Sequence, residues 1–204
     1  MRWKAWIRHS GIIVVLGLLS WLGLGVVQQG RVGPPSAPGG NSGGSQPGYY
    51  PVTHVTDGDT IDVKIAGKTE IVRLLGMDTP ETHDPRKAVQ CYGEIAAAET
   101  RKLVGGKQVR LAGDSEDSDR DKYHRLLRYV YLPDGTFVNQ YLTEQGYAFA
   151  YTIFPISKLD QFRAWEAEAR AAGRGLWSNC QVHLDGHIEQ TNNVGPIPTT
   201  TTAN

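Results

Sequence analysis

The sequence has no net charge, because its 21 basic residues are balanced by 21 acidic ones. It also has no acidic residue among the first 48 positions, where the only charges are Arg2, Lys4, Arg8 and Arg31. From Tyr49 onward, 17 basic side chains stand against 21 acidic ones. Bulk charge therefore cannot hold a polyanion, and a nucleic acid would need a local basic rim or a bound cation.

Cysteine and long hydrophobic runs are scarce as well. Two cysteines, Cys91 and Cys180, allow a single disulfide, whose formation depends on the compartment. One long apolar run, residues 11–27 (GIIVVLGLLSWLGLGVV), follows three positive charges and is intermediate in length between a signal-peptide core and a membrane-spanning helix. No Ala-x-Ala cleavage box or lipid-attachment cysteine follows it, which favours an uncleaved anchor over a signal peptide.

Both alternatives place the rest of the chain outside the cytoplasm, because the basic residues precede the apolar run. Residues 28–48 are rich in Gly, Pro and Ser and are typical of a flexible linker, which argues against a buried core helix at 11–27. We therefore expect a signal peptide or anchor at 1–27, a linker at 28–48, a folded domain at 49–182 and a disordered tail at 183–204, disordered from about Glu189.

Two acidic turns flank a predicted β-hairpin near the start of this domain. Residues 60–66 and 69–75 alternate between apolar and polar positions around a Gly67-Lys68 turn. Asp59 precedes the first strand and Asp78 follows the second, so antiparallel pairing brings the two carboxylates together. Such a pair needs a cation, and hard oxygen ligands suit Ca²⁺ or Mg²⁺. Either acidic turn alone could be an ordinary turn, because Asp and Gly are common turn residues. The occurrence of both turns on one hairpin, with Arg73 between them, favours a functional site.

The remaining pattern predicts an α+β domain. A small five-stranded Greek-key barrel of the OB type, with about three helices, fits three consecutive antiparallel strands followed by a helix. Ser157 and Asp160 resemble a capping box at the start of the last helix. The acidic segment 113–122 lacks the central glycine and the terminal glutamate of an EF-hand loop and is interpreted as a solvated connection. Strands are expected at 49–55, 60–66, 69–75, 107–112 and 125–131, and helices at 91–104, 138–145 and 157–172.

Three motifs occur in a fixed order: DGDT, RLLGMDTPE and DKYHRLLRYVY. Together they resemble the thermonuclease family of staphylococcal nuclease-like domains, over about 49–177. The resemblance implies a Ca²⁺-dependent phosphodiesterase that acts on DNA and RNA, prefers single strands, leaves 3′-phosphate ends and works as a monomer. The chain departs from the family's best-known member at His124, where that member has a glycine, and in its two cysteines, which extracytoplasmic relatives often have.

The resemblance also implies a role for individual residues. It makes Asp59, Asp78 and the Thr79 carbonyl the Ca²⁺ ligands. It makes Glu81 the residue that orients or deprotonates water, and Arg73 and Arg125 the two groups that hold phosphate. The nucleotide contacts would be Lys122, Tyr123 and Tyr151. In an oxidising compartment Cys91 and Cys180 would pair and fasten the C-terminal segment to the barrel.

Simpler roles exist for several of these side chains. Arg73 could be a structural bridge to Asp78 or Glu81, Arg125 an ordinary surface charge, and Tyr123 and Tyr151 core or rim aromatics. The competing function is a catalytically silent OB module that binds nucleic acid or protein; silent relatives have usually lost a catalytic residue. A carbohydrate- or protein-binding module would leave the acidic and arginine set unexplained.

Overall fold

The structure is a computed structural model that describes residues 48–84 and 87–194. The predicted membrane segment at 1–27 and all of the predicted linker except Gly48 lie outside these residues. Within the two described ranges, no helix has the length and apolar character needed to cross a bilayer.

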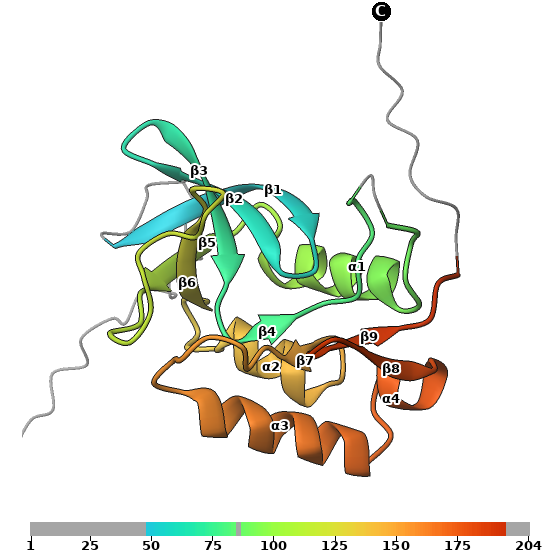
Figure 1. The fold of residues 1–204 in the computed structure, drawn as a ribbon. Coiled ribbons are helices and arrows are strands. Elements are labelled where there is room, and N and C mark those ends of the chain that lie inside the picture. Colours follow the sequence, from blue (N-terminus) through green and yellow to red (C-terminus); the bar gives the residue numbers. More distant parts are fainter. Residues whose placement is uncertain (1–47, 85–86, 195–204) are drawn as a thin grey trace, which may run out of the picture. The chain divides into compact units, whose positions relative to one another are not determined.

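Five strands close into a barrel, in the order β1-β2-β3-β6-β5. Neighbouring strands are antiparallel except β3 and β6, which run parallel and complete the closure (Figure 1). This arrangement confirms the predicted five-stranded OB-type barrel. The strands are β1 (Tyr49–Asp57), β2 (Thr60–Ile65), β3 (Lys68–Leu74), β5 (Gln108–Ala112) and β6 (Leu126–Tyr131).

The hairpin of β2 and β3 forms as predicted, with its turn one residue earlier. Ile65 pairs with Lys68, so Ala66 and Gly67 make the turn, with φ of 48° and 83°. Positive φ at both central residues is the geometry of the type I′ turn that matches strand twist. Alternation along β2 fully buries Ile61 and Val63 in the barrel.

The described residues contain three helices of seven or more residues and one short one. They are α1 (Gly93–Val104), α2 (Val138–Glu144), α3 (Leu159–Ala171) and the short α4 (Leu176–Asn179). Phe162 of α3 is fully buried, and its ring lies against Gly76, where a Cβ would come within 2.4 Å of it. This close approach fastens α3 beneath the residues that follow β3 (Figure 1).

The predicted capping box at the start of α3 is wrong. Ser157 lies before Lys158, the N-cap residue, and no side chain caps the helix. The Ser157 hydroxyl instead donates to Asp114 Oδ2 at 2.6 Å, which also accepts from the Tyr129 hydroxyl at 2.6 Å. The acidic connection after β5 is therefore fastened to the fold at Asp114 by tertiary hydrogen bonds.

Two small sheets complete the domain. Strand β4 (Met77–Asp78) pairs with β7 (Phe149–Ala150), and β8 (Val182–Asp185) pairs with β9 (Ile188–Thr191). The second pair corrects part of the predicted disordered tail, because residues 182–191 form a hairpin, while residues 195–204 of that prediction lie outside the described residues. The polar composition of the hairpin gave no strand signal, and bonds to residues 89–91 hold it.

Candidate active site

Asp59 comes immediately before β2 and lies beside Arg73 of β3. Thr60 pairs with Arg73 across the hairpin, and the Leu74 amide donates to the Asp59 carbonyl at 2.8 Å. The Asp59 carboxylate is almost buried and accepts two hydrogen bonds from Thr79, one from its amide and one from its hydroxyl, each 3.0 Å long. The hairpin therefore fixes the backbone of Asp59, and Thr79 fixes its carboxylate.

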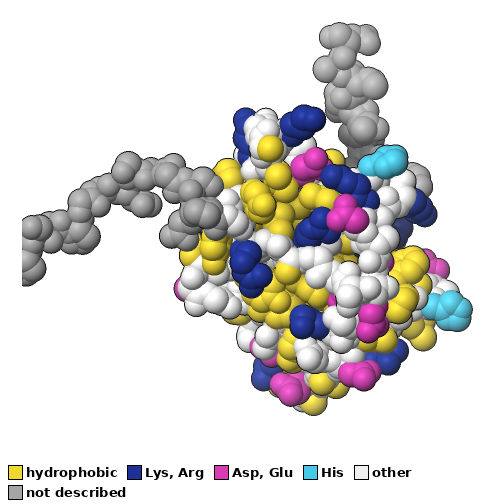
Figure 2. All heavy atoms as spheres, turned by 90° about the vertical axis from the view of Figure 1, so that its left-hand side faces the viewer, with side chains coloured by type: hydrophobic (Ala, Val, Ile, Leu, Met, Phe, Trp, Pro, Cys, Tyr) yellow, Lys and Arg dark blue, Asp and Glu magenta, His cyan; other side chains and the backbone are white. Residues whose placement is uncertain are grey.

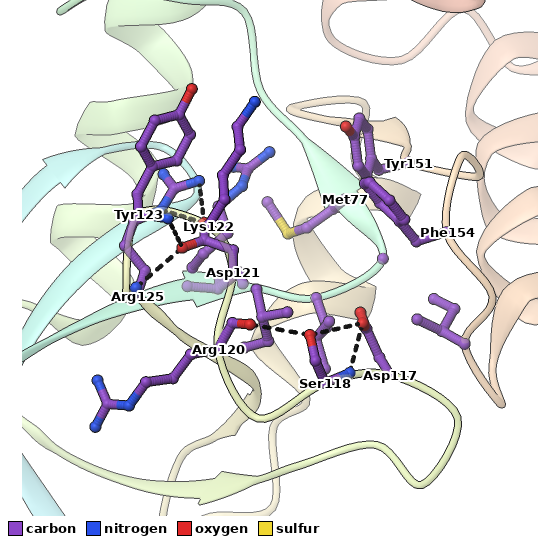
Figure 3. A pocket seen from close by; sticks show the side chains of 16 residues that line it. Met77, Asp117, Ser118, Arg120, Asp121, Lys122, Tyr123, Arg125, Tyr151 and Phe154 are labelled. Atoms are coloured by element: carbon purple, nitrogen blue, oxygen red, sulfur yellow. Dashed lines mark hydrogen bonds and ion pairs between the residues drawn. The ribbon is translucent and has the colours of Figure 1, made fainter.

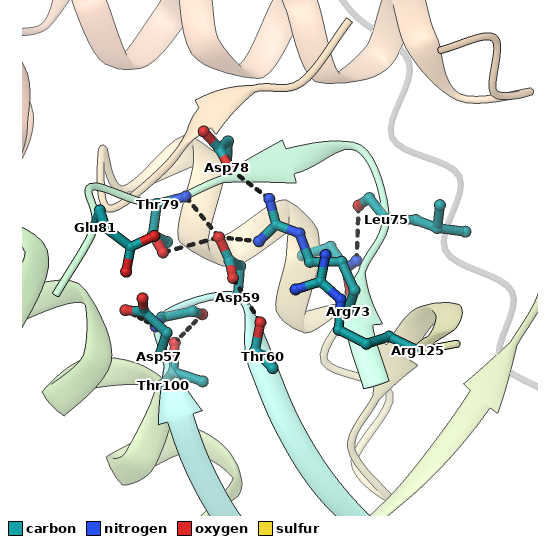
Figure 4. A network of polar contacts seen from close by, with 12 residues as sticks. Asp57, Asp59, Thr60, Arg73, Leu75, Asp78, Thr79, Glu81, Thr100 and Arg125 are labelled. Atoms are coloured by element: carbon teal, nitrogen blue, oxygen red, sulfur yellow. Dashed lines mark hydrogen bonds and ion pairs between the residues drawn. The ribbon is translucent and has the colours of Figure 1, made fainter. Parts of the chain in front are cut away.

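Asp78 and Asp59 converge on one guanidinium group. Arg73 forms ion pairs with both carboxylates, and only 14% of its side chain is exposed (Figure 4). The hairpin thus brings the two predicted metal carboxylates together, and in this structure Arg73 is the cation between them. The alternative of a structural bridge from Arg73 to Asp78 describes part of this geometry.

Gly58 allows the two acidic turns to meet. A Cβ at this position would lie 2.7 Å from the Thr79 methyl group, which is closer than carbon atoms can approach without displacement. The Gly58 carbonyl also accepts a buried hydrogen bond of 2.6 Å from Thr100 on α1. The DGDT motif therefore requires glycine here for packing between the turns and the helix.

Glu81 is held by the backbone that follows it. Its Oε1 accepts hydrogen bonds from the amides of Thr82, His83 and Asp84 at 2.9, 2.8 and 3.0 Å. Burial alone would raise its pKa, but these amides and a hydrogen bond with Asp57 outweigh burial and lower the pKa below its usual value. Glu81 is therefore ionised at neutral pH and fixed in orientation.

Asp57 is the site residue for which the sequence predicted no role. Burial raises the pKa of Asp57 to about 7. The hydrogen bond from the Gly58 amide lowers this pKa, and the nearby charge of Glu81 raises it further. Its Oδ1 also accepts from Thr82 at 3.1 Å. The two carboxyl groups face each other in Figure 4, and the charge of Glu81 beside the buried Asp57 favours a proton on Asp57. The sequence feature that could have pointed to Asp57 is its place as the first aspartate of the DGDT motif.

Arg125 lies beside Arg73 but has a different partner (Figure 4). Its Nε donates to Asp121 Oδ2 at 2.7 Å, and a second nitrogen lies 2.7 Å from the same oxygen. His124, immediately before it, has φ of 64°, the left-handed region that glycine enters without strain. Glycine would adopt this conformation more readily than histidine does.

A pocket of about 590 Å³ opens next to the two arginines. Lys122 and Tyr123 line one side, and Tyr151 and Phe154 line the other (Figure 3). Tyr123 is 62% exposed, with the Lys122 amine 5.0 Å from its ring centre, so it is a rim aromatic. Figure 2 shows Lys and Arg side chains interspersed with hydrophobic ones on one face of the molecule.

The predicted site residues thus form two adjoining groups. One surrounds Arg73 and consists of Asp59, Asp78 and Thr79, with Glu81 and Asp57 next to Thr79. The other lines the pocket, which Arg73, Arg125, Lys122, Tyr123 and Tyr151 share. Sequence reasoning missed Phe154, a 55%-exposed pocket residue with no motif around it, and Asp121, the partner of Arg125.

The structure pairs Cys91 with Cys180 across 89 residues, with a Cα–Cα distance of 5.9 Å. Cys91 precedes α1 and Cys180 follows α4, so the pair joins the C-terminal segment to the loop before α1.

The oxygen donors around Arg73 are of the kind that a hard cation prefers. Asp59 and Asp78 both face one positive group, and Thr79 lies directly against Asp59. Among residues 48–84 and 87–194, no group of three or more His, Cys, Asp or Glu side chains has a metal-binding arrangement. A hard cation at this site would therefore be held by two carboxylates together with backbone oxygens.

Comparison with known proteins gives a consistent answer. Residues 71–179 match the family described as "Staphylococcal nuclease homologue". The chain is 46% identical over 124 residues to "Endonuclease YncB" of Bacillus subtilis, and 40% identical over 149 residues to "SPbeta prophage-derived endonuclease YokF" of the same organism. These alignments cover 60% and 72% of this chain, but only 58% and 48% of those relatives.

A third relative is matched along nearly its whole length. The "Thermonuclease" of Staphylococcus hyicus is 33% identical over 171 residues, which make up 83% of this chain and 97% of that protein. The matched region includes the barrel, both acidic turns and the arginine pair described above. The chain belongs to the staphylococcal nuclease homologue family.

Proposed function

We propose that the protein is a Ca²⁺-dependent endonuclease that hydrolyses phosphodiester bonds in DNA and RNA and leaves 3′-phosphate ends. The observation that carries this proposal is the placement of Arg73 and Arg125 side by side, next to a fixed carboxylate and a nucleotide-sized pocket. The relatives named endonuclease and thermonuclease support it.

The two arginines are the phosphate-binding groups. A guanidinium group can bind two phosphate oxygens at once, which a lysine amine cannot. Each arginine is ion-paired with aspartate, so both side chains are already oriented before substrate arrives. As negative charge grows on the phosphorus oxygens, these fixed groups stabilise the transition state, and losing one such contact slows a reaction by ~10²–10³.

Glu81 is the group that accepts a proton from the attacking water. The three amides that bind its Oε1 hold one carboxylate oxygen. Because its pKa is lowered, Glu81 is in the proton-accepting form at neutral pH. A base within reach of the water contributes ~10²–10⁴ to the rate.

Calcium would be held by Asp59, Asp78 and the Thr79 carbonyl. Bound there, it would act as a Lewis acid that offsets repulsion between phosphate and the incoming oxygen nucleophile. The chain contributes two carboxylates kept in place by β-strand pairing, and Thr79 fixes the orientation of Asp59 through two hydrogen bonds. Their charge is shared with Arg73, which can bind phosphate once a cation satisfies the carboxylates.

The pocket supports a preference for single strands. Tyr123 and Phe154 are exposed rings on opposite sides of it, and unpaired bases stack on such rings at ~1–3 kcal/mol each. Lys122 supplies a further positive charge at the rim. A base can enter only when it is not stacked in a duplex.

We also propose that the domain acts as a monomer outside the cytoplasm, secreted or anchored through residues 1–27, with 28–48 as its linker. The sequence of the first 27 residues supports this. The pairing of Cys91 with Cys180 also does, because disulfides persist in oxidising compartments.

The test is digestion of heat-denatured plasmid DNA by the full chain, with Ca²⁺ and with a chelator. Cleavage should require Ca²⁺, and Arg73→Ala should lower it by ~10²–10³. Arg101→Ala, which removes an exposed arginine on α1, is the matched control and should retain the rate. Cleavage that persists with chelator would refute the mechanism, and no cleavage by the wild type would favour a silent nucleic-acid-binding module.

A further inference from the structure

Gln90 closes the loop that carries Glu81. The Glu81 amide donates to Gln90 Oε1 at 2.8 Å, and the Gln90 amide donates to the Glu81 carbonyl at 2.9 Å. Gln90 is buried, with 5% of its surface exposed. The backbone of Glu81 is therefore fixed on both its donor and its acceptor side by one residue, nine positions later in the chain.

The other end of the Gln90 side chain is held by strand β9. Its Nε2 donates to Gln190 Oε1 at 2.9 Å. If the Gln90 amide group turned over, Nε2 would face the Glu81 amide, donor against donor, and Oε1 would face the oxygen of Gln190. The Glu81 amide can only donate, so it requires the Gln90 oxygen, and the contact with Gln190 stabilises the same orientation of the Gln90 side chain.

Strand β9 is itself fastened to the same loop. The Cys91 amide donates to the Asn192 carbonyl at 2.8 Å, and the fully buried Thr191 hydroxyl donates to the Cys91 carbonyl at 2.7 Å. The Val194 amide donates to the Val89 carbonyl at 2.9 Å. The Cys91–Cys180 pair adds a covalent connection at the point where this contact begins.

We propose that Gln90 is a positioning residue for Glu81, and that the C-terminal hairpin β8–β9, tied by the Cys91–Cys180 pair, keeps Gln90 in place. The inference rests on the proposed function of Glu81. The hairpin lies after residue 179, where the match to the family ends. A segment outside the matched domain thus supports the proposed base through a continuous series of hydrogen bonds.

The decisive experiment is a double-mutant cycle in the full chain with Ca²⁺. Gln90→Leu keeps the size of the side chain but removes both hydrogen bonds. It should lower kcat by about tenfold or more, because small displacements of a catalytic group are costly, while KM stays within about twofold. In a Glu81→Ala background the same substitution should have no further effect. Gln140→Leu is the matched control, because Gln140 on α2 is half-buried and donates a side-chain hydrogen bond only to Glu144.

A second readout does not depend on activity. Amide hydrogen exchange at Thr82, His83 and Asp84, which bind the Glu81 carboxylate, should be faster in Gln90→Leu than in wild type. Gln190→Ala, which breaks the same series further from Glu81, should show a smaller change of the same kind. Replacement of both cysteines by serine should also speed exchange in this loop.

The outcomes separate the two proposals. A wild type that does not cleave with Ca²⁺ refutes the nuclease function, and the exchange data then decide alone whether Gln90 fixes the loop. If the wild type is active, the positioning role is overturned when Gln90→Leu lowers kcat by the same factor in the wild-type background and in the Glu81→Ala background. Unchanged exchange in both Gln90→Leu and Gln190→Ala overturns it as well.

Discussion

Two of the acidic pairs in the described part of the chain contain a carboxyl group with a strongly raised pKa, and they are held in different ways. At the candidate site Asp57 faces Glu81, and between α3 and β9 Glu166 faces Glu189. In both pairs burial is the main reason that one pKa rises to about 7. Both pairs place two carboxyl groups close together where burial raises the pKa of one of them. The groups that surround each pair therefore distinguish the two.

The donors around the two pairs differ. Glu81 accepts from three backbone amides, and Asp57 from an amide and a hydroxyl. Glu189, by contrast, accepts from Arg170 through both oxygens at 2.7 Å, and Glu166 lies 3.9 Å from the same arginine. Neutral donors orient a carboxylate without cancelling its charge, whereas arginine cancels it. Glu81 thus keeps the charge that its proposed role as a base requires, whereas Arg170 offsets the charge of Glu166 and Glu189, here called the structural pair.

The largest expected effect comes from making one substitution in each pair. Glu81→Gln keeps shape and removes the base, so we expect kcat to fall by ~10²–10⁴. Glu166→Gln makes the corresponding substitution at the structural pair, on α3, and should leave kcat within about threefold. Steady-state cleavage of denatured DNA measures both. Similar losses in the two variants would mean that the pairs do not differ in function.

Calcium should stabilise the fold through the site alone. At about 100 times its Kd, Ca²⁺ should raise the free energy of unfolding by about 2.7 kcal/mol, because it binds the folded state only. Asp78→Asn should abolish this gain, and Glu166→Gln should retain it. Urea unfolding with Ca²⁺ or chelator measures the difference. A gain that disappears in Glu166→Gln would place the cation at the wrong pair of acids.

Removing the charge from the structural pair should stabilise the protein at high pH. The pKa of Glu166 is raised from 4.5 to about 7, so the folded state binds a proton more tightly than the unfolded state. Its contribution to stability is therefore full below about pH 4.5 and is lost as the pH rises to about 7. Gln in its place keeps an acceptor for the Ala150 amide and has no charge to lose.

We therefore expect Glu166→Gln to be more stable than wild type at pH 8 by on the order of 2 kcal/mol, and to match it at pH 4. Urea unfolding at the two pH values, with chelator present, tests this. The groups that face Glu166 include Glu189, Arg170 and the Ala150 amide, and none of them changes in the variant. A stability difference independent of pH would contradict the assignment.

The sequence predicts the site where local geometry determines it. Alternation and a turn are enough to bring the two ends of the hairpin together, but the predicted Gly67-Lys68 turn would pair Thr60 with Leu75, whereas Thr60 pairs with Arg73. The meeting of Asp59 and Asp78 follows from the same hairpin. The turn position differed by one residue, because the prediction gave weight to Gly67 while both Ala66 and Gly67 have positive φ.

What the sequence does not predict depends on contacts between distant segments. Asp57 meets Glu81 only because the loop after Glu81 folds back over it. Ser157 caps no helix, because its hydroxyl donates instead to Asp114, 43 residues earlier in the chain. The hairpin β8–β9 has little apolar alternation, and its bonds to residues 89–91 are about 100 positions apart in the chain. No local pattern encodes such contacts.

The smallest expected effect tests whether arginine really neutralises the structural pair. Arg170→Met at pH 8 leaves Glu166 and Glu189 without their cation and should lower the free energy of unfolding by about 1 kcal/mol, since the arginine is half-exposed. Below pH 5 the loss should shrink, because a protonated Glu166 no longer needs the cation. Arg163→Met on the same helix, whose partner Asp160 is 97% exposed, should change stability by less than ~0.5 kcal/mol at either pH. A loss from Arg170→Met that is the same at both pH values would assign its role to packing on Trp177, whose ring lies 4.0 Å away, and would remove the distinction between the two acid pairs.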